Sequence, residues 1–149
     1  MSYRGIRVLT VLVGLCLLVP AFFLPAITTG PPGSEPGSQV GWVCAVMATA
    51  SLAGIFKGSI ASATSDILCL MASGLVNPLL LLYLFFCIWP RLVWIRLALA
   101  LIVVAGVVSS WEFFYLSHFT PKIGHFLWVA GILVILAGEL ARLSQKRAA

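Results

Sequence analysis

Charged side chains are scarce in this sequence. Asp, Glu, Lys and Arg make up only 9% of its residues, whereas 62% are hydrophobic. A soluble domain typically carries about 25% charged residues, so this supply is too small to build a water-facing surface. The apolar stretches are also long and continuous, unlike the alternating segments of a membrane barrel. We therefore expect an all-α membrane protein that forms one domain over residues 1–149.

Side chains for catalysis and metal binding are scarce as well. The chain has four acidic residues and two histidines, and it contains no nucleophile elbow, phosphate-binding loop or H-E-x-x-H motif. Its four cysteines show no C-x-x-C spacing, and we interpret them as small apolar core residues. A disulfide between Cys44 and Cys69 stays open as an alternative. We expect no cofactor and no metal, and an enzyme is the least favoured class.

The net charge of +5 does not indicate nucleic-acid binding. A nucleic-acid interface needs a basic patch with interleaved aromatic residues, whereas the basic residues here flank apolar runs. Such flanking charge orients helices in a membrane, so we expect the lipid bilayer to be the main partner. The flanking residues are Arg4, Arg7, Arg91, Arg96, Arg142, Lys146 and Arg147.

Four apolar stretches are long enough to be membrane-spanning helices. At about 1.5 Å per residue, roughly 20 residues cross the hydrocarbon core of a bilayer. The expected spans cover residues 6–26, 67–89, 92–116 and 123–141. We expect the first span to be retained, because the residues that follow it offer a poor signal-peptide cleavage site.

Residues 40–56 form a further apolar stretch, and the distribution of basic residues decides its status. If this stretch spans, four basic residues face the cytoplasm and five face the outside; if it does not, seven face the cytoplasm and two the outside. The positive-inside rule favours the second arrangement. We expect four spans with both termini cytoplasmic, and 40–56 as an outer-face or re-entrant helix. Five spans remain the alternative.

Two outer connections are also expected. Residues 28–39 are rich in proline and glycine, which predicts a loop. Residues 117–122 form a short turn, with Pro121 opening the last helix.

The second span carries the clearest local signal. Pro78 has no N–H to donate to the carbonyl of Gly74 and its ring pushes against that carbonyl, which predicts a kink. Ser73, Gly74 and Asn77 share one face and would bring a neighbouring helix close. We interpret Asn77 mainly as a kink-repair and packing residue, with a ligand or ion contact as the alternative.

Small residues form stripes on the last two spans. One stripe leads up to a carboxylate and predicts a narrow packing seam, and the other predicts a flat face for close helix packing. At the inner end of the last span, Glu139 and Arg142 are expected to pair on the helix surface. The first stripe is Ala98, Ile102, Ala105, Ser109 and Glu112; the second is Gly124, Trp128, Gly131, Ile135 and Gly138.

Polar side chains are expected to gather at the outer face. A histidine pair with a carboxylate would hold zinc or relay protons. These residues have no regular metal-ligand spacing, however, and we interpret them mainly as interface residues. Together with Asn77 and Pro78 they are the candidate functional residues. The outer group is Asp66, Glu112, His118 and His125, with Lys57 and Lys122 nearby.

The chain resembles a loose group of small uncharacterised bacterial multi-pass inner-membrane proteins. The shared pattern is G-W at residue 41, N-P-L-L-L from Asn77 and G-x-x-L-W from Gly124, and it covers about residues 41–140. The chain departs from the group at Gly74 and at His125. The resemblance implies a multi-pass topology and brings no function with it.

Three functions follow as hypotheses. The leading one is an accessory or structural membrane protein that packs with itself or with a membrane partner, because small-residue seams are present and catalytic motifs are absent. A subunit of an oligomeric transporter or channel using Asn77 and Glu112 is the alternative. A membrane enzyme using the outer histidines and acids comes third.

Overall fold

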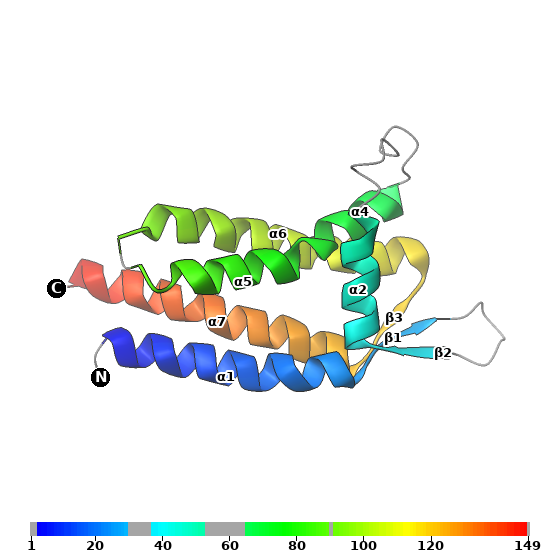
Figure 1. The fold of residues 1–149 in the computed structure, drawn as a ribbon, viewed down its shortest axis with the longest axis horizontal. Coiled ribbons are helices and arrows are strands. Elements are labelled where there is room, and N and C mark those ends of the chain that lie inside the picture. Colours follow the sequence, from blue (N-terminus) through cyan, green and yellow to red (C-terminus); the bar gives the residue numbers. More distant parts are fainter. Residues whose placement is uncertain (1–2, 30–36, 53–64, 90, 149) are drawn as a thin grey trace.

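The long helices lie side by side as a bundle, and both chain termini lie at the same end of it (Figure 1). The computed structural model describes residues 3–29, 37–52, 65–89 and 91–148. The bundle consists of α1 (Tyr3–Phe23), α4 (Ser65–Gly74), α5 (Val76–Phe86), α6 (Val93–Ser117) and α7 (Ile123–Ala148).

Within the described residues, four helical stretches are long and apolar enough to cross a membrane, as predicted. They are Gly5–Phe23, Ile67–Phe86, Val93–Ser117 and Ile123–Ala141. The stretch that was ambiguous in the sequence forms a shorter apolar helix, α2 (Gly41–Ser51), which runs across the bundle rather than along it (Figure 1). This agrees with four spans plus one non-spanning helix. The predicted continuation of that segment over 53–56 lies outside the described residues.

The second span is interrupted as Pro78 predicts. α4 ends at Gly74 and α5 begins at Val76, so that Leu75 separates two helices. The Leu75 N–H donates to the carbonyl of Ala72 over 3.3 Å, three residues back instead of four. The break lies one turn before the proline, where its ring would otherwise press on the preceding turn. The predicted kink in the span over 67–89 is therefore a break between two helices, and the second of them ends at Phe86.

The prediction of a loop over residues 28–39 is wrong at both ends, because these ends form strands. β1 (Pro25–Thr29) pairs with β2 (Gly37–Val40) and with β3 (Thr120–Pro121) in a sheet of order β2-β1-β3. Both pairings are antiparallel. The middle of the predicted loop, residues 30–36, lies outside the described part of the chain.

Proline and glycine are compatible with this sheet because of where they stand in it. Pro25 and Gly37 occupy the first positions of their strands, and Pro121 lies on an edge strand, where a missing N–H costs little. Pro121 pairs with Ile27 instead of opening the last helix, which begins at Ile123. The sheet therefore ties the start of α7 to the segment that follows α1.

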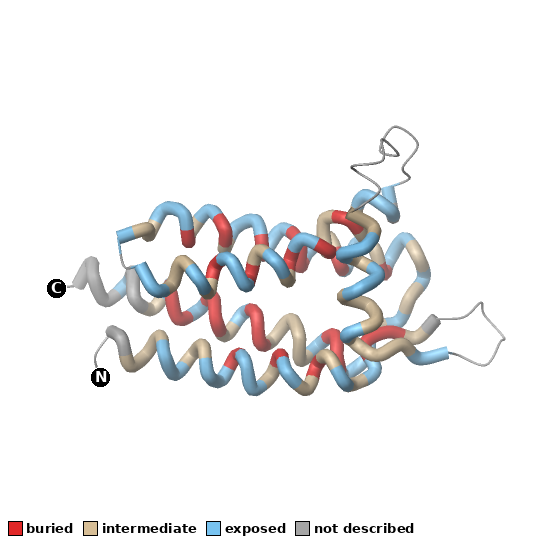
Figure 2. The backbone as a smooth tube through the Cα atoms, viewed as in Figure 1, coloured by how far each residue is buried: buried red, intermediate tan, exposed pale blue. Residues whose placement is uncertain are grey.

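The core runs along the middle of the bundle, where the buried residues of different helices face one another (Figure 2). Val103 and Ile132 have no exposed surface, and Tyr83 and Val76 are almost fully buried. The opposite sides of the helices expose large apolar side chains, which in a membrane would meet lipid. The bundle is therefore built for an apolar surrounding.

The small-residue stripe predicted on α6 lies on the outside of the bundle and not in its core. Ala98, Ala105 and Glu112 are exposed, whereas Leu99 and Val103 pack into the core. A helix that is apolar on every side has no polar face to mark the side turned outward. Periodicity alone therefore does not show which side of α6 faces the other helices of the bundle.

The glycine stripe of the last span does form a close helix contact, as predicted, and its partner is α1. A Cβ placed on Gly131 would lie 2.8 Å from the carbonyl oxygen of Gly14, and one placed on Gly138 would overlap Thr10. α1 and α7 run side by side along most of their length (Figure 1). Only glycine allows the two backbones to approach this closely.

Candidate functional site

A cavity of about 160 Å³ lies at the sheet end of the bundle, beneath α2. We call it the sheet-end cavity. Apolar side chains form most of its wall, and they come from every helix of the bundle and from the sheet. The lining residues are Ala21, Phe22, Ala26, Ile27, Gln39, Gly41, Cys44, Ala45, Met47, Ala48, Leu70, Ser73, Asn77, Ser110, Phe113, Phe114, Phe119, Gly124, His125 and Trp128.

Close backbone contacts hold α2 against the sheet-end cavity. A Cβ on Gly74 would overlap the carbonyl of Ala48 on α2, and one on Gly41 would overlap the carbonyl of Ala21 on α1. The predicted role of Gly74 in bringing a neighbour close is therefore confirmed, with α2 as that neighbour. The two glycines let α2 lie directly against α4 and the end of α1, so that α2 forms one wall of the cavity.

His125 is a buried polar side chain in the wall of the sheet-end cavity. It is only 6% exposed and belongs to the first turns of α7. Its ring lies 4.6 Å from that of Phe114, 5.1 Å from that of Trp111 and 5.5 Å from that of Trp128, measured between centroids. Its Nε2 has no hydrogen-bond partner among the described residues. An unpartnered buried polar atom typically costs about 1–3 kcal/mol, so this atom calls for an explanation.

Asn77 also faces the cavity, and its amide is already engaged. The Trp128 Nε1–H donates to Asn77 Oδ1 over 2.9 Å, which ties α5 to α7. This bond is what the helix-packing interpretation of Asn77 expects. Pro78, by contrast, is exposed and acts through the helix break described above.

Two other members of the predicted outer group, Glu112 and His118, do not line the cavity with His125. Glu112 is exposed on α6, and His118 is exposed at the end of that helix in a left-handed conformation with φ of 55°. Asp66 lies in α4, but its side chain is not described, and Lys57 lies outside the described residues. Among the described side chains, no three His, Cys, Asp or Glu residues gather as metal ligands.

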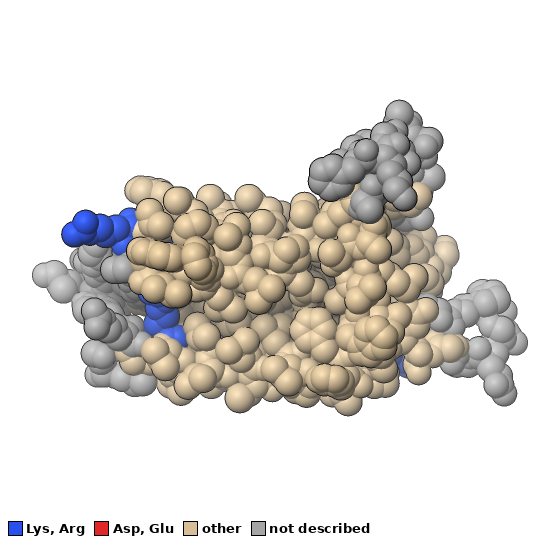
Figure 3. Space-filling model, in the orientation of Figure 1, with Lys and Arg blue, Asp and Glu red and all other residues tan. Residues whose placement is uncertain are grey.

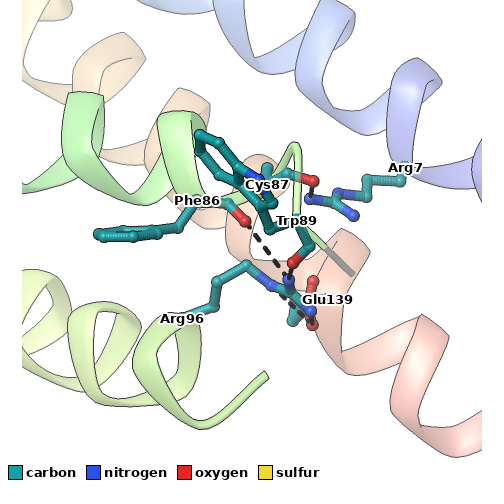
Figure 4. A network of polar contacts seen from close by, with 6 residues as sticks. All are labelled: Arg7, Phe86, Cys87, Trp89, Arg96 and Glu139. Atoms are coloured by element: carbon teal, nitrogen blue, oxygen red, sulfur yellow. Dashed lines mark hydrogen bonds and ion pairs between the residues drawn. The ribbon is translucent and has the colours of Figure 1, made fainter. Parts of the chain in front are cut away.

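A buried ion pair lies at the opposite end of the bundle, near the chain termini (Figure 4). Arg96 on α6 has no exposed surface, and Glu139 on α7 is 3% exposed. The guanidinium donates to Glu139 Oε1 through Nη2 at 2.9 Å and through Nε at 3.3 Å. This arrangement joins the last two spans.

Sequence reasoning missed this pair. Arg96 was counted as a flanking cytoplasmic charge, and Glu139 was expected to pair with Arg142 on the helix surface. Glu139 is buried and contacts Arg96, so its predicted position on the helix surface is wrong. The pairing with Arg142 stays a prediction, because the Arg142 side chain is not described. The pairing of Arg96 with Glu139 could have been predicted from the positions of the two residues in their spans. Two antiparallel spans that meet at a short outer turn bring Arg96, near the start of one, level with Glu139, near the end of the other.

The same network caps α5. Arg96 Nη1 donates to the carbonyl of Trp89 at 2.6 Å and to that of Phe86 at 3.4 Å, and Arg7 on α1 donates to the carbonyl of Cys87 (Figure 4). The last carbonyls of a helix have no partner within it and carry its negative end. Two arginines from different helices therefore satisfy the inner end of α5.

The cysteines give no sign of redox chemistry. All four are free thiols, including Cys44 and Cys69, which the sequence left open as a disulfide. Burial raises the pKa of the Cys44 thiol above its ordinary value, so it stays protonated at neutral pH and is a poor nucleophile.

Comparison with protein-family models, with curated proteins and with solved structures finds no match to this chain. The sheet-end cavity and the Arg96–Glu139 pair are therefore the features from which its chemistry has to be inferred.

Proposed function

We propose that this chain is a small accessory or structural membrane protein that packs with a second copy of itself or with another membrane protein. The observation that supports this most directly is the outward side of α6, where Ala98 and Ala105 are exposed and Ser109 is half-buried. Small residues on a lipid-facing helix allow a second backbone to approach closely. We call Ala98, Ile102, Ala105 and Ser109 the outer α6 stripe.

The surroundings of the outer α6 stripe fit a helix contact. The Ser109 hydroxyl donates to the carbonyl of Ala105 over 3.0 Å, so it carries no unpaired polar atom into the lipid. Large side chains rise from the same exposed side of the helix, with Trp94 82%, Leu101 72% and Tyr115 78% exposed. A row of small residues among large ones gives a groove into which a partner helix would fit.

Lengthening the small side chains tests this proposal. We expect Ala105→Leu to lower the association constant about tenfold, equivalent to ~1.4 kcal/mol, because the added atoms hold the partner away. Val108→Leu, at a 56% exposed position of the same helix outside the stripe, should leave association unchanged. Crosslinking in membranes and native mass spectrometry in mild detergent measure the complex. A wild-type chain that is monomeric under several mild conditions would remove the proposal.

The alternative, a subunit of an oligomeric transporter or channel, has less support. Asn77 is bonded to Trp128, and Glu112 lies on the exposed side of α6. Between the two ends of the bundle, the core consists of packed apolar side chains such as Leu80, Val103 and Ile132. A pathway would have to form between copies. Flux that Asn77→Leu and Glu112→Gln both leave unchanged would argue against it.

We also propose that the chain lies in a bacterial inner membrane with both termini in the cytoplasm. Basic side chains are most visible at the end that carries the termini, and only a small basic area is visible at the sheet end (Figure 3). Positive charge favours the cytoplasmic side. The resemblance to small bacterial inner-membrane proteins supports the same placement and stays a prediction.

Reporter fusions test this orientation. Green fluorescent protein fused after Arg91 should fluoresce, because the turn between α5 and α6 lies at the same end as the termini. Alkaline phosphatase fused after Lys57 should be active, because this position follows α2 at the sheet end. The reverse pattern of the two reporters would invert the orientation.

A further inference from the structure

The sheet-end cavity contains a polar atom that nothing in its wall explains. His125 Nε2 is buried, it belongs to a residue that lines the cavity, and it has no hydrogen-bond partner in the described part of the chain. Aromatic rings surround the imidazole, among them Trp111, Phe114 and Trp128. His125 Nε2 is thus a single unpartnered polar atom in an apolar wall. Ligand sites typically have this composition, with a few polar groups that orient the ligand.

Three other polar side chains of the wall make hydrogen bonds within the chain. Asn77 Oδ1 accepts from Trp128, the Ser73 hydroxyl donates to the carbonyl of Leu70 over 2.8 Å, and the Ser110 hydroxyl donates to that of Val107 over 2.6 Å. Among the described side chains that line the cavity, His125 Nε2 is the buried polar atom left without a hydrogen-bond partner.

The size of the cavity restricts what it would hold. A volume of about 160 Å³ is close to that of engineered apolar cavities of about 150 Å³ that bind benzene. One ring with a short substituent fits this space, whereas a whole phospholipid does not. The lining is apolar, and the surrounding helices belong to membrane spans, so a molecule that partitions into the bilayer would reach the site.

We propose that the sheet-end cavity binds a small bilayer-soluble amphiphile, an apolar ring or chain end that carries one hydroxyl or carbonyl group. The ligand's polar group contacts His125 Nε2, and its apolar part lies against the aromatic rings beneath α2. This inference is independent of the outer α6 stripe, which lies on the opposite side of α6 from Ser110 and Phe114. A chain that stays monomeric would therefore leave it standing.

The two histidines of the sequence make a direct test possible. Protein labelled with ¹⁵N-histidine is placed in lipid nanodiscs and titrated with 4-ethylphenol or with ethylbenzene, which differ by one hydroxyl group. We expect 4-ethylphenol to move the Nε2 signal of His125 in a saturable way. Ethylbenzene should bind about tenfold more weakly, because it makes no hydrogen bond to the imidazole. The exposed His118 serves as the internal reference and should not respond.

Two variants separate the cavity from general partitioning into the lipid. Ala45→Leu places a larger side chain in the cavity wall, whereas Ala50→Leu makes the same change at an exposed position of α2. Only the first should abolish saturable binding. His125→Phe removes the imidazole nitrogen but retains an aromatic ring, so this variant should bind 4-ethylphenol and ethylbenzene with equal affinity. Binding is measured on the NMR signals of the two probes. Nanodiscs that contain the Ala45→Leu variant serve as the blank.

Three results would overturn the proposal. The first is a linear response of His125 and His118 together, which indicates partitioning into the bilayer. The second is saturable binding that Ala45→Leu leaves intact, which places the ligand elsewhere. The third is an unchanged preference for 4-ethylphenol in His125→Phe, which assigns the hydrogen bond to another group.

Discussion

Replacing Arg96 by methionine should lower the free energy of unfolding by about 3–5 kcal/mol, because it leaves the Glu139 carboxylate buried beside an apolar side chain. The two side chains are almost fully buried and share two hydrogen bonds to one carboxylate oxygen. The same change also frees the carbonyls of Phe86 and Trp89 at the end of α5. Unfolding in mixed detergent micelles, followed by tryptophan fluorescence, measures the loss.

Removing both charges should restore most of this stability. The double variant Arg96→Met with Glu139→Leu has no buried charge left, and apolar replacements of buried ion pairs are often neutral. We expect it to stay below the wild type by about 1 kcal/mol, since the α5 carbonyls still lack their donor. Arg91→Met, at an exposed position, is the control and should change stability by less than about 0.5 kcal/mol. Additive losses in the double variant would show that the pair is not coupled.

The second large effect is expected where α1 meets α7. Gly131→Val should cost about 1–3 kcal/mol, because even a Cβ would lie 2.8 Å from both the carbonyl oxygen of Gly14 and the side chain of Leu18. The helices would have to separate along a contact that continues from Thr10 to the start of the sheet.

A matched substitution isolates this contact. Ala137→Val adds bulk at an exposed position of α7, and it should leave the free energy of unfolding within about 0.5 kcal/mol of the wild type. The same detergent titration serves for both variants. Equal stability of Gly131→Val and Ala137→Val would mean that the glycine contact does not hold α1 in place.

The predictable part of the candidate site was its local chemistry. A proline beside an asparagine in an apolar run predicted both the helix break at Leu75 and a packing role for Asn77, since these depend on neighbours along the chain. His125 was also a candidate, but with Glu112 and His118 as companions. It lies among aromatic rings instead, because the first turn of α7 turns it inward while the other two stay exposed.

The strands were missed for a related reason. Each is short and begins or ends with proline or glycine, and their pairing joins Ile27 to Pro121 across most of the chain. No local pattern contains such a pairing. The cavity beneath α2 depends on the same long-range contacts, so its existence was not predictable from the sequence.

The sequence by itself determined how many helices are long and apolar enough to cross a membrane and where the second is broken, because these depend on length, hydropathy and local backbone chemistry. The distribution of basic residues indicated which further apolar segment does not span. The tertiary structure alone decided which side of α6 faces its neighbours and that Arg96 pairs with Glu139. The physical reason is that a helix that is apolar on every side has no polar face to indicate which side turns away from the bundle. The partner of a buried charge, in turn, depends on which helices become adjacent in the fold.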